Sequence, residues 1–180
     1  MRSARAVGRS LTLALVGSAL LALPRLAAAQ TSVGGYIGAE FDNKDNWFLF
    51  GAEGRIPIQA SPTFAFDFNP RFTYHSYGSG AKAIQIDANA LYYWELVRPK
   101  VIAPYVGLGA AFVHFSGDDA SQNKVGLNLL MGTKVFVSPT SPLVPFVNAQ
   151  YTFITDYPNS YTIVIGASYN FHKGSTSSTH

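Results

Sequence analysis

Two short segments of the chain bring a serine close to a histidine, the pair that nucleophilic hydrolysis uses. Ser76 directly follows His75, and Ser116 lies two residues after His114. Such a pair is active only when the imidazole contacts the hydroxyl and a third side chain orients the imidazole. Adjacent residues of a strand point to opposite faces, and no third residue is placed to orient either base. The sequence therefore predicts that the chain is not an enzyme and has no catalytic residue.

The same histidines raise metal binding as a second kind of chemistry. Asp118 and Asp119 follow His114 closely, and His75 is the other candidate ligand. These residues do not have a spacing typical of metal ligands, and surface loops collect such residues by chance. We therefore expect no metal site and no cofactor.

Seven charged residues form the most distinctive set in the chain, because all of them fall on one face of the predicted strands. They are Glu40, Glu53, Arg55, Asp67, Arg71, Asp87 and Lys134. A functional interpretation would be a gate or a selective path for solutes. We prefer a structural interpretation, in which four acids and three bases pair with each other in an enclosed polar core.

The elements that carry these charges have the period of two that is typical of β-strands, and helical spacing is nowhere sustained. In the third segment, Phe66, Phe68 and Phe72 share one face while Asp67 and Arg71 share the other. Each segment is long enough to cross a bilayer when tilted, which takes roughly 9 to 11 residues. The eight predicted strands cover Ser32–Phe41, Trp47–Ile56, Thr63–Tyr74, Lys82–Trp94, Ala103–Phe115, Lys124–Val137, Val144–Ile154 and Ser160–Phe171.

The connections between these strands alternate in composition, as an up-and-down meander requires. The second, fourth and sixth contain proline and are predicted to be tight periplasmic turns, with Pro57, Pro62, Pro99, Pro104, Pro139 and Pro142. The others are rich in Asp, Asn, Gly and Ser and are expected to face outward, at 42–46, 75–81, 116–123 and 155–159. Pro70 lies inside the third strand and lacks a backbone donor, which predicts a bulge or a weakened edge.

The charge content decides between a soluble barrel and a membrane barrel. Charged residues make up 13% of the chain, against about 25% in ordinary soluble domains. A soluble barrel would have to expose its seven strand charges to water, and these are too few for such a surface. If the charged face of the strands points inward instead, the charges fill a narrow lumen and the apolar face contacts lipid.

The distribution of glycine and of aromatic residues agrees with that orientation. The charged face also carries glycines that would relieve crowding in a narrow lumen: Gly34, Gly38, Gly51, Gly107, Gly109, Gly126, Gly132 and Gly166. Aromatic residues near the strand ends predict two interfacial girdles. One would contain Phe41, Phe48, Tyr74 and Tyr161, and the other Phe64, Trp94, Phe146 and Phe171.

The two ends of the chain are expected to lie outside the barrel. Residues 1–29 have three arginines before an apolar run and end in three alanines, which predicts a cleavable signal peptide. Four of the 13 basic residues lie in this segment, which leaves nine bases against ten acids and gives no reason to expect a nucleic-acid partner. We expect one barrel domain over 30–171 and a disordered polar tail over 172–180.

The start of the fifth strand, Pro104-Tyr105-Val106-Gly107-Leu108-Gly109, and the closing alternation Tyr161, Ile163, Ile165, Ala167, Tyr169, Phe171 resemble a known family. The chain resembles the small outer-membrane β-barrels of the OmpX and OmpA transmembrane type from Gln30 to Phe171. The resemblance implies export through the periplasm, contact with outer-membrane lipid and lipopolysaccharide, and a terminal strand that the barrel-insertion machinery reads through Tyr169 and Phe171. In that family the aromatic residue is usually last, whereas nine residues follow Phe171 here.

Taken together, the fold class expected is all-β, an eight-stranded antiparallel up-and-down transmembrane barrel. Its expected function is a structural or surface-interaction role in the outer membrane, as a monomer with a narrow lumen plugged by charges. The alternative is a barrel of the OmpW-like or porin-like type that transports small, hydrophobic molecules. Apolar residues on the inward face favour that alternative, namely Leu49, Leu91, Tyr93, Leu130 and Phe136.

Overall fold

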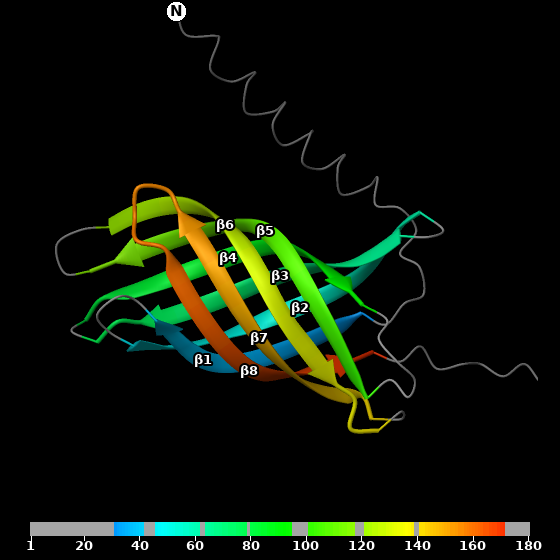
Figure 1. Cartoon of the computed structure of the whole chain (residues 1–180). Coiled ribbons are helices and arrows are strands. Elements are labelled where there is room, and N and C mark those ends of the chain that lie inside the picture. Colours follow the sequence, from blue (N-terminus) through cyan, green and yellow to red (C-terminus); the bar gives the residue numbers. More distant parts are fainter. Residues whose placement is uncertain are drawn as a thin grey trace, which may run out of the picture.

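The structure is a computed structural model that describes residues 31–41, 46–61, 64–78, 80–94, 101–117, 121–138 and 141–171. Eight strands in this part of the chain form a closed barrel in which every strand pairs antiparallel with its neighbours, and β1 pairs with β8 (Figure 1). The predicted eight-stranded up-and-down barrel is therefore confirmed. The strands are β1 Ser32–Phe41, β2 Asn46–Ser61, β3 Phe64–Ser76, β4 Lys82–Tyr93, β5 Ile102–Ser116, β6 Ser121–Val135, β7 Leu143–Ile154 and β8 Ser160–Asn170.

Some predictions concern segments beyond the described residues. The signal segment 1–29, the tail 172–180 and the loop residues Asp118 and Asp119 all lie there, as do Pro62, Pro99 and Pro139. Among the residues that the structure describes, no helix is long and apolar enough to cross a membrane.

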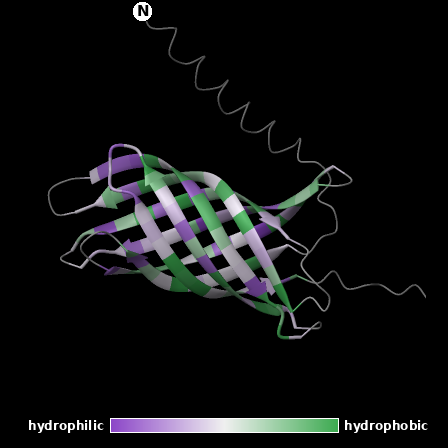
Figure 2. Cartoon of the chain, viewed as in Figure 1, coloured by the Kyte–Doolittle hydropathy of each residue, from purple (hydrophilic) through white to green (hydrophobic). Residues whose placement is uncertain are grey.

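Hydrophobic and polar residues alternate along the strands (Figure 2), and the exposed fractions show that the hydrophobic set faces outward. In β4, Ile86 is 54% exposed whereas Asp87, the next residue, is 2% exposed. Every strand places large hydrophobic side chains on the outer surface, among them Ile37, Phe50, Phe72, Ile86, Leu108, Leu129, Val147 and Ile165. Five of the seven predicted lumen charges are buried: Glu40, Glu53, Arg55, Arg71 and Asp87. The barrel is thus apolar outside and polar inside.

The prediction that Pro57 lies in a turn is wrong, because β2 continues through it to Ser61. Pro104, also predicted in a turn, lies inside β5 and pairs with Thr133 of β6. Pro57 faces Asp67 of β3 in regular register, and the register shifts only between Gln59 and Ser61. On its other side β2 pairs with β1 only as far as Arg55, so Pro57 faces no strand there. A proline is tolerated in a strand where its missing N–H has no acceptor to serve.

Of the two effects predicted for Pro70, a bulge or a weakened edge, the structure has no bulge but an interrupted ladder. The register of β3 against β2 is the same on both sides of Pro70, although the ladder pairs opposite Gly54 and Arg55 are interrupted. The side-chain amide of Asn69 donates a hydrogen bond to the carbonyl oxygen of Gly54 at 2.7 Å. This amide supplies the donor that proline lacks, so the strand passes the site without an extra residue.

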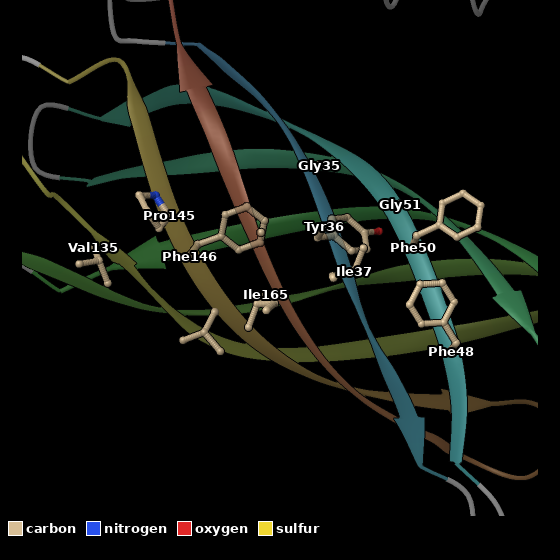
Figure 3. Close-up of a pocket in the computed structure, with 12 residues that line it drawn as sticks. Gly35, Tyr36, Ile37, Phe48, Phe50, Gly51, Val135, Pro145, Phe146 and Ile165 are labelled. Carbon is tan, nitrogen blue, oxygen red and sulfur yellow. The ribbon is translucent and has the colours of Figure 1, made fainter.

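The aromatic girdles are present with one correction. Phe41, Phe48, Tyr161, Phe64, Trp94 and Phe171 are all exposed on the outer surface near the strand ends. Phe146, which was assigned to the second girdle, is 3% exposed and lies inside the barrel. It belongs to a cluster of buried residues with Tyr36, Leu49 and Val164. Figure 3 shows Phe146 on β7 and Tyr36 on β1, with β8 between these strands.

Glycines on the inner face make room for the large side chains of the lumen. A Cβ on Gly132 would come within 2.5 Å of the Tyr105 hydroxyl, and a Cβ on Gly166 within 2.6 Å of the Phe146 ring. Both distances are shorter than a carbon atom tolerates. The lumen is therefore filled by aromatic side chains that pack directly on the backbone of facing strands, which is the tight filling expected of an eight-stranded barrel.

Candidate functional site in the barrel lumen

The centre of the lumen holds a carboxylate between two arginines. Glu53 of β2 places Oε1 2.5 Å from Nε of Arg55, and its Oε2 lies 3.8 Å from Nε of Arg71 on the paired strand β3. All three side chains are at most 3% exposed. One acid thus faces two bases in a region that water does not reach, and removing it would leave two cations without an anion.

Arg55 is enclosed by aromatic side chains as well as by its acid. Its guanidinium donates to the hydroxyls of Tyr93, at 2.7 Å, and Tyr105, at 3.2 Å. The guanidinium carbon also lies 4.8 Å from the centre of the Tyr105 ring and 4.9 Å from that of Phe146. A desolvated arginine gains from such ring faces. The planar group is therefore held from several strands at once.

Arg71 is linked to the opposite wall of the barrel. Its Nη1 donates to the side-chain oxygens of Gln150, at 2.5 Å, and Asn148, at 3.4 Å. The guanidinium carbon lies 4.5 Å from the centre of the Tyr36 ring, and the Tyr36 hydroxyl is 2.6 Å from that of Thr73. Arg71 therefore spans the lumen from β3 to β7.

Asp87 is held by amides and not by a direct ion pair in the described part of the chain. Gln85 and Asn128 donate to its Oδ1 at 2.8 and 2.9 Å. From Asn128, hydrogen bonds continue through Thr152 to Gln150, the partner of Arg71. The acid Asp87 and the base Arg71 are thus connected through polar side chains in the middle of the lumen.

The remaining predicted charges, Asp67 and Lys134, lie at the turn end of the lumen, the end near the predicted periplasmic turns. Nζ of Lys134 lies 3.8 Å from Oδ2 of Asp67 and 5.0 Å from the centre of the Tyr93 ring. Both charged side chains are about one-eighth exposed, at 12% and 13%. This pair is the most accessible of the lumen charges, as expected from its position near the strand ends.

The opposite end, the loop end, lies near the loops predicted to face outward and contains a contact between His75 and Glu40 that the sequence did not predict. Nδ1 of His75 lies 2.6 Å from Oε2 of Glu40, and the Tyr77 hydroxyl donates to the same oxygen at 3.0 Å. His75 is 2% exposed. The period of two already places His75 on the face of Arg71 and Thr73, so the strand pattern contained the signal that it points inward.

The contact between Glu40 and His75 contradicts the expectation that no third residue orients this histidine. Ser76 is exposed on the other face, and Nε2 of His75 has no hydrogen-bond partner in the described structure. Near the loop end, Nδ1 of His114 contacts Asn123 at 2.6 Å and its Nε2 lies 3.5 Å from the hydroxyl of Ser121, a residue that the sequence argument did not consider. The two serine–histidine pairs therefore do not form a hydrolytic site among the described residues.

The same positions bear on metal binding and on the transport alternative. The described residues contain no group of three or more His, Asp or Glu side chains that could hold a metal ion.

Apolar layers do exist inside the barrel, since Leu91 and Leu130 pack with Tyr105 and Tyr93. Phe136 follows the end of β6 and is only partly buried. The buried apolar residues of the lumen form three separate clusters in the described part of the chain.

The two residues proposed as the insertion signal lie on the outer surface. Tyr169 is 48% and Phe171 is 52% exposed, and their rings meet edge to face at 5.5 Å between centroids. Tyr169 faces Val33 of β1 across the seam where the barrel closes. Both aromatic rings are thus presented outside the barrel at the end of its last strand.

No family model and no curated protein matches the sequence. Solved structures match it over most of their own length. Neisserial surface protein A superposes with a TM-score of 0.62 and 16% identity, covering 81% of this chain and 98% of its own. The attachment invasion locus protein Ail of Yersinia pestis gives 0.54 and 17%, covering 79% and 97%. The outer membrane enzyme PagL gives 0.51 and 13%, covering 78% and 99%. These likenesses concern the fold, and PagL demonstrates that the fold alone does not exclude catalysis.

Proposed function

We propose that this chain, which has the fold of the small eight-stranded outer-membrane β-barrels, is an integral protein of the bacterial outer membrane with a structural or surface-interaction role. The observation that carries the proposal is the inverted surface. Large hydrophobic side chains are exposed on every strand, while Glu53, Arg55, Arg71 and Asp87 are buried inside. Water would not solvate such an exterior, whereas the hydrocarbon of a bilayer would.

The known partners of such a barrel form part of the proposal. Outer-membrane lipid and lipopolysaccharide would contact the outer face, and the insertion machinery would read Tyr169 and Phe171. We propose that the chain acts as a monomer, because its closed barrel has no free strand edge for a second copy to extend. Two structural neighbours are named a surface protein and an attachment invasion locus protein, which supports a role at the cell surface.

A closed lumen distinguishes this proposal from small-molecule transport, which requires an open one. A solute crossing the barrel would have to displace Arg55 from Glu53 and Arg71 from Gln150, and would leave these buried groups without partners. Such uncompensated charges cost several kcal/mol each. The proposal therefore includes a lumen that stays closed.

Planar-bilayer recording of the purified mature chain tests this closed lumen. We expect no steady conductance above that of the bare bilayer, at either sign of the applied potential. The matched control is the double variant Arg55→Ala/Tyr105→Ala, which removes the largest buried side chains and is expected to give measurable openings. Large, steady openings of the unaltered chain would favour the transport alternative.

A further inference from the structure

The loop end of the barrel contains a pocket of about 350 Å³ that none of the functions above uses. Its wall is aromatic and comes from separate parts of the chain: Trp47 of β2, Tyr77 after β3, Phe115 of β5 and Tyr157 between β7 and β8. The rings are in contact around the mouth. Their centroids are separated by 5.5 Å between Trp47 and Tyr77, 6.3 Å between Tyr77 and Phe115, and 4.4 Å between Phe115 and Tyr157.

The floor of this pocket is polar. Glu40 lines it and is only 7% exposed, and its carboxylate is held by His75 and Tyr77. Tyr77 and Phe115 also pack on a buried apolar layer formed by Ala83, Ala111, Val113 and Ile154. Residues that line the pocket are therefore fixed by contacts with buried groups beneath the loops.

The polar groups around the pocket include both donors and acceptors. Lys82 donates, Glu40 accepts, and Ser116 and Asn159 can do both. An organic cation would gain from Glu40 and from the ring faces but would be opposed by Lys82, and an anion would meet the opposite balance. A neutral ring that carries hydroxyls and has an apolar face would use all of these groups and would also stack on the aromatic wall.

We propose that this pocket, the mouth pocket, binds a saccharide of one or two rings. The volume agrees, since it lies at the small end of ligand pockets, which span roughly 300 to 1,000 Å³. The saccharide could come from a free glycan or from the sugar of a lipid, because the two present the same ring chemistry. The inference names a ligand class for the surface-interaction role and rests on the proposed function for the direction in which the mouth faces.

The two tryptophans of the chain give a direct reporter. Trp47 lines the mouth pocket, whereas Trp94 lies just beyond β4 at the opposite end of the barrel. In a Trp94→Phe variant, the emission therefore reports Trp47 alone. The folded full chain should be purified in a polyoxyethylene detergent, because a sugar-based detergent would compete for the pocket and a choline-based one would confound the tetramethylammonium control. It should then be titrated with methyl glycosides of glucose, galactose, mannose and N-acetylglucosamine, and with tetramethylammonium.

We expect a saturable change of Trp47 emission with at least one glycoside, with a dissociation constant in the low millimolar range or below. Phe115→Ala should weaken binding by about tenfold. Phe112→Ala, on the outer face of the same strand, should leave binding unchanged while heat-modifiable gel migration verifies that both variants fold. Displacement of the glycoside by lipopolysaccharide would identify a lipid sugar as the source, and failure to displace it would identify a free glycan.

The inference is overturned if no glycoside gives a saturable change, if tetramethylammonium alone does so, or if Phe115→Ala binds as tightly as its parent. The titration reports on the mouth pocket and the conductance recording on the lumen, so either proposal can fail without the other.

Discussion

Replacing Glu53 with leucine is expected to lower the free energy of unfolding by about 3–5 kcal/mol, because it leaves buried charges without a counter-charge. Glu53 contacts both Arg55 and Arg71, and none of the three side chains is more than 3% exposed. Neither guanidinium can lose its proton to escape the cost. Urea-induced unfolding of the chain in phosphatidylcholine vesicles, followed by tryptophan emission, measures the change.

A double variant distinguishes this electrostatic cause from a simple loss of packing. Glu53→Leu/Arg55→Met removes one charge of each sign and fills the space with apolar side chains. We therefore expect its loss of unfolding free energy to be smaller than the sum of the losses in the two single variants. A loss below about 1 kcal/mol for Glu53→Leu alone would mean that water reaches the cluster and that the lumen is not closed at this level.

The second large effect concerns the outer face. Leu129→Arg is expected to destabilise the barrel in a bilayer by about 2–4 kcal/mol, since it places a cation near the middle of the lipid-facing surface. Leu129 is 54% exposed and lies near the centre of β6, so the substitution breaks no internal contact of comparable size. The same vesicle unfolding experiment measures it.

Leu143→Arg is the matched control for the outer face. Leu143 is similarly exposed, at 51%, but it begins β7 at the rim, where the arginine reaches the interface at a cost of about 0–1 kcal/mol. Equal and small losses at both positions would indicate that the outer face is surrounded by water, and would remove the main support for the membrane location.

The alternation of residues was sufficient to predict the faces of the strands. A strand has only two faces, so one clear position such as Asp87 assigns its neighbours Ile86 and Ala88 to the other side. The barrel followed because eight such strands with short connections close without an edge. The position of Pro57 could not be assigned in the same way, since it depends on where β1 stops pairing with β2.

The contacts inside the lumen were less predictable, because they depend on the register between strands. Glu40 of β1 contacts His75 of β3 although these two strands do not pair. Strand β2 lies between them, and its Trp47 pairs with Glu40 while its Leu49 pairs with His75. Phe146 lies on the same face of β7 as the buried Asn148 and Gln150, so the period of two assigns it to the lumen and its assignment to a girdle was wrong. Gly166 lies opposite it on β8 and leaves the space that its ring fills.

Refolding of the urea-denatured mature chain with and without phospholipid vesicles tests the central claim most directly. Heat-modifiable migration on a gel measures the folded fraction. An apolar outer face around a charged lumen predicts that the compact, heat-modifiable form appears with vesicles and that the chain aggregates when lipid and detergent are absent. A soluble, folded monomer in buffer alone would contradict the account.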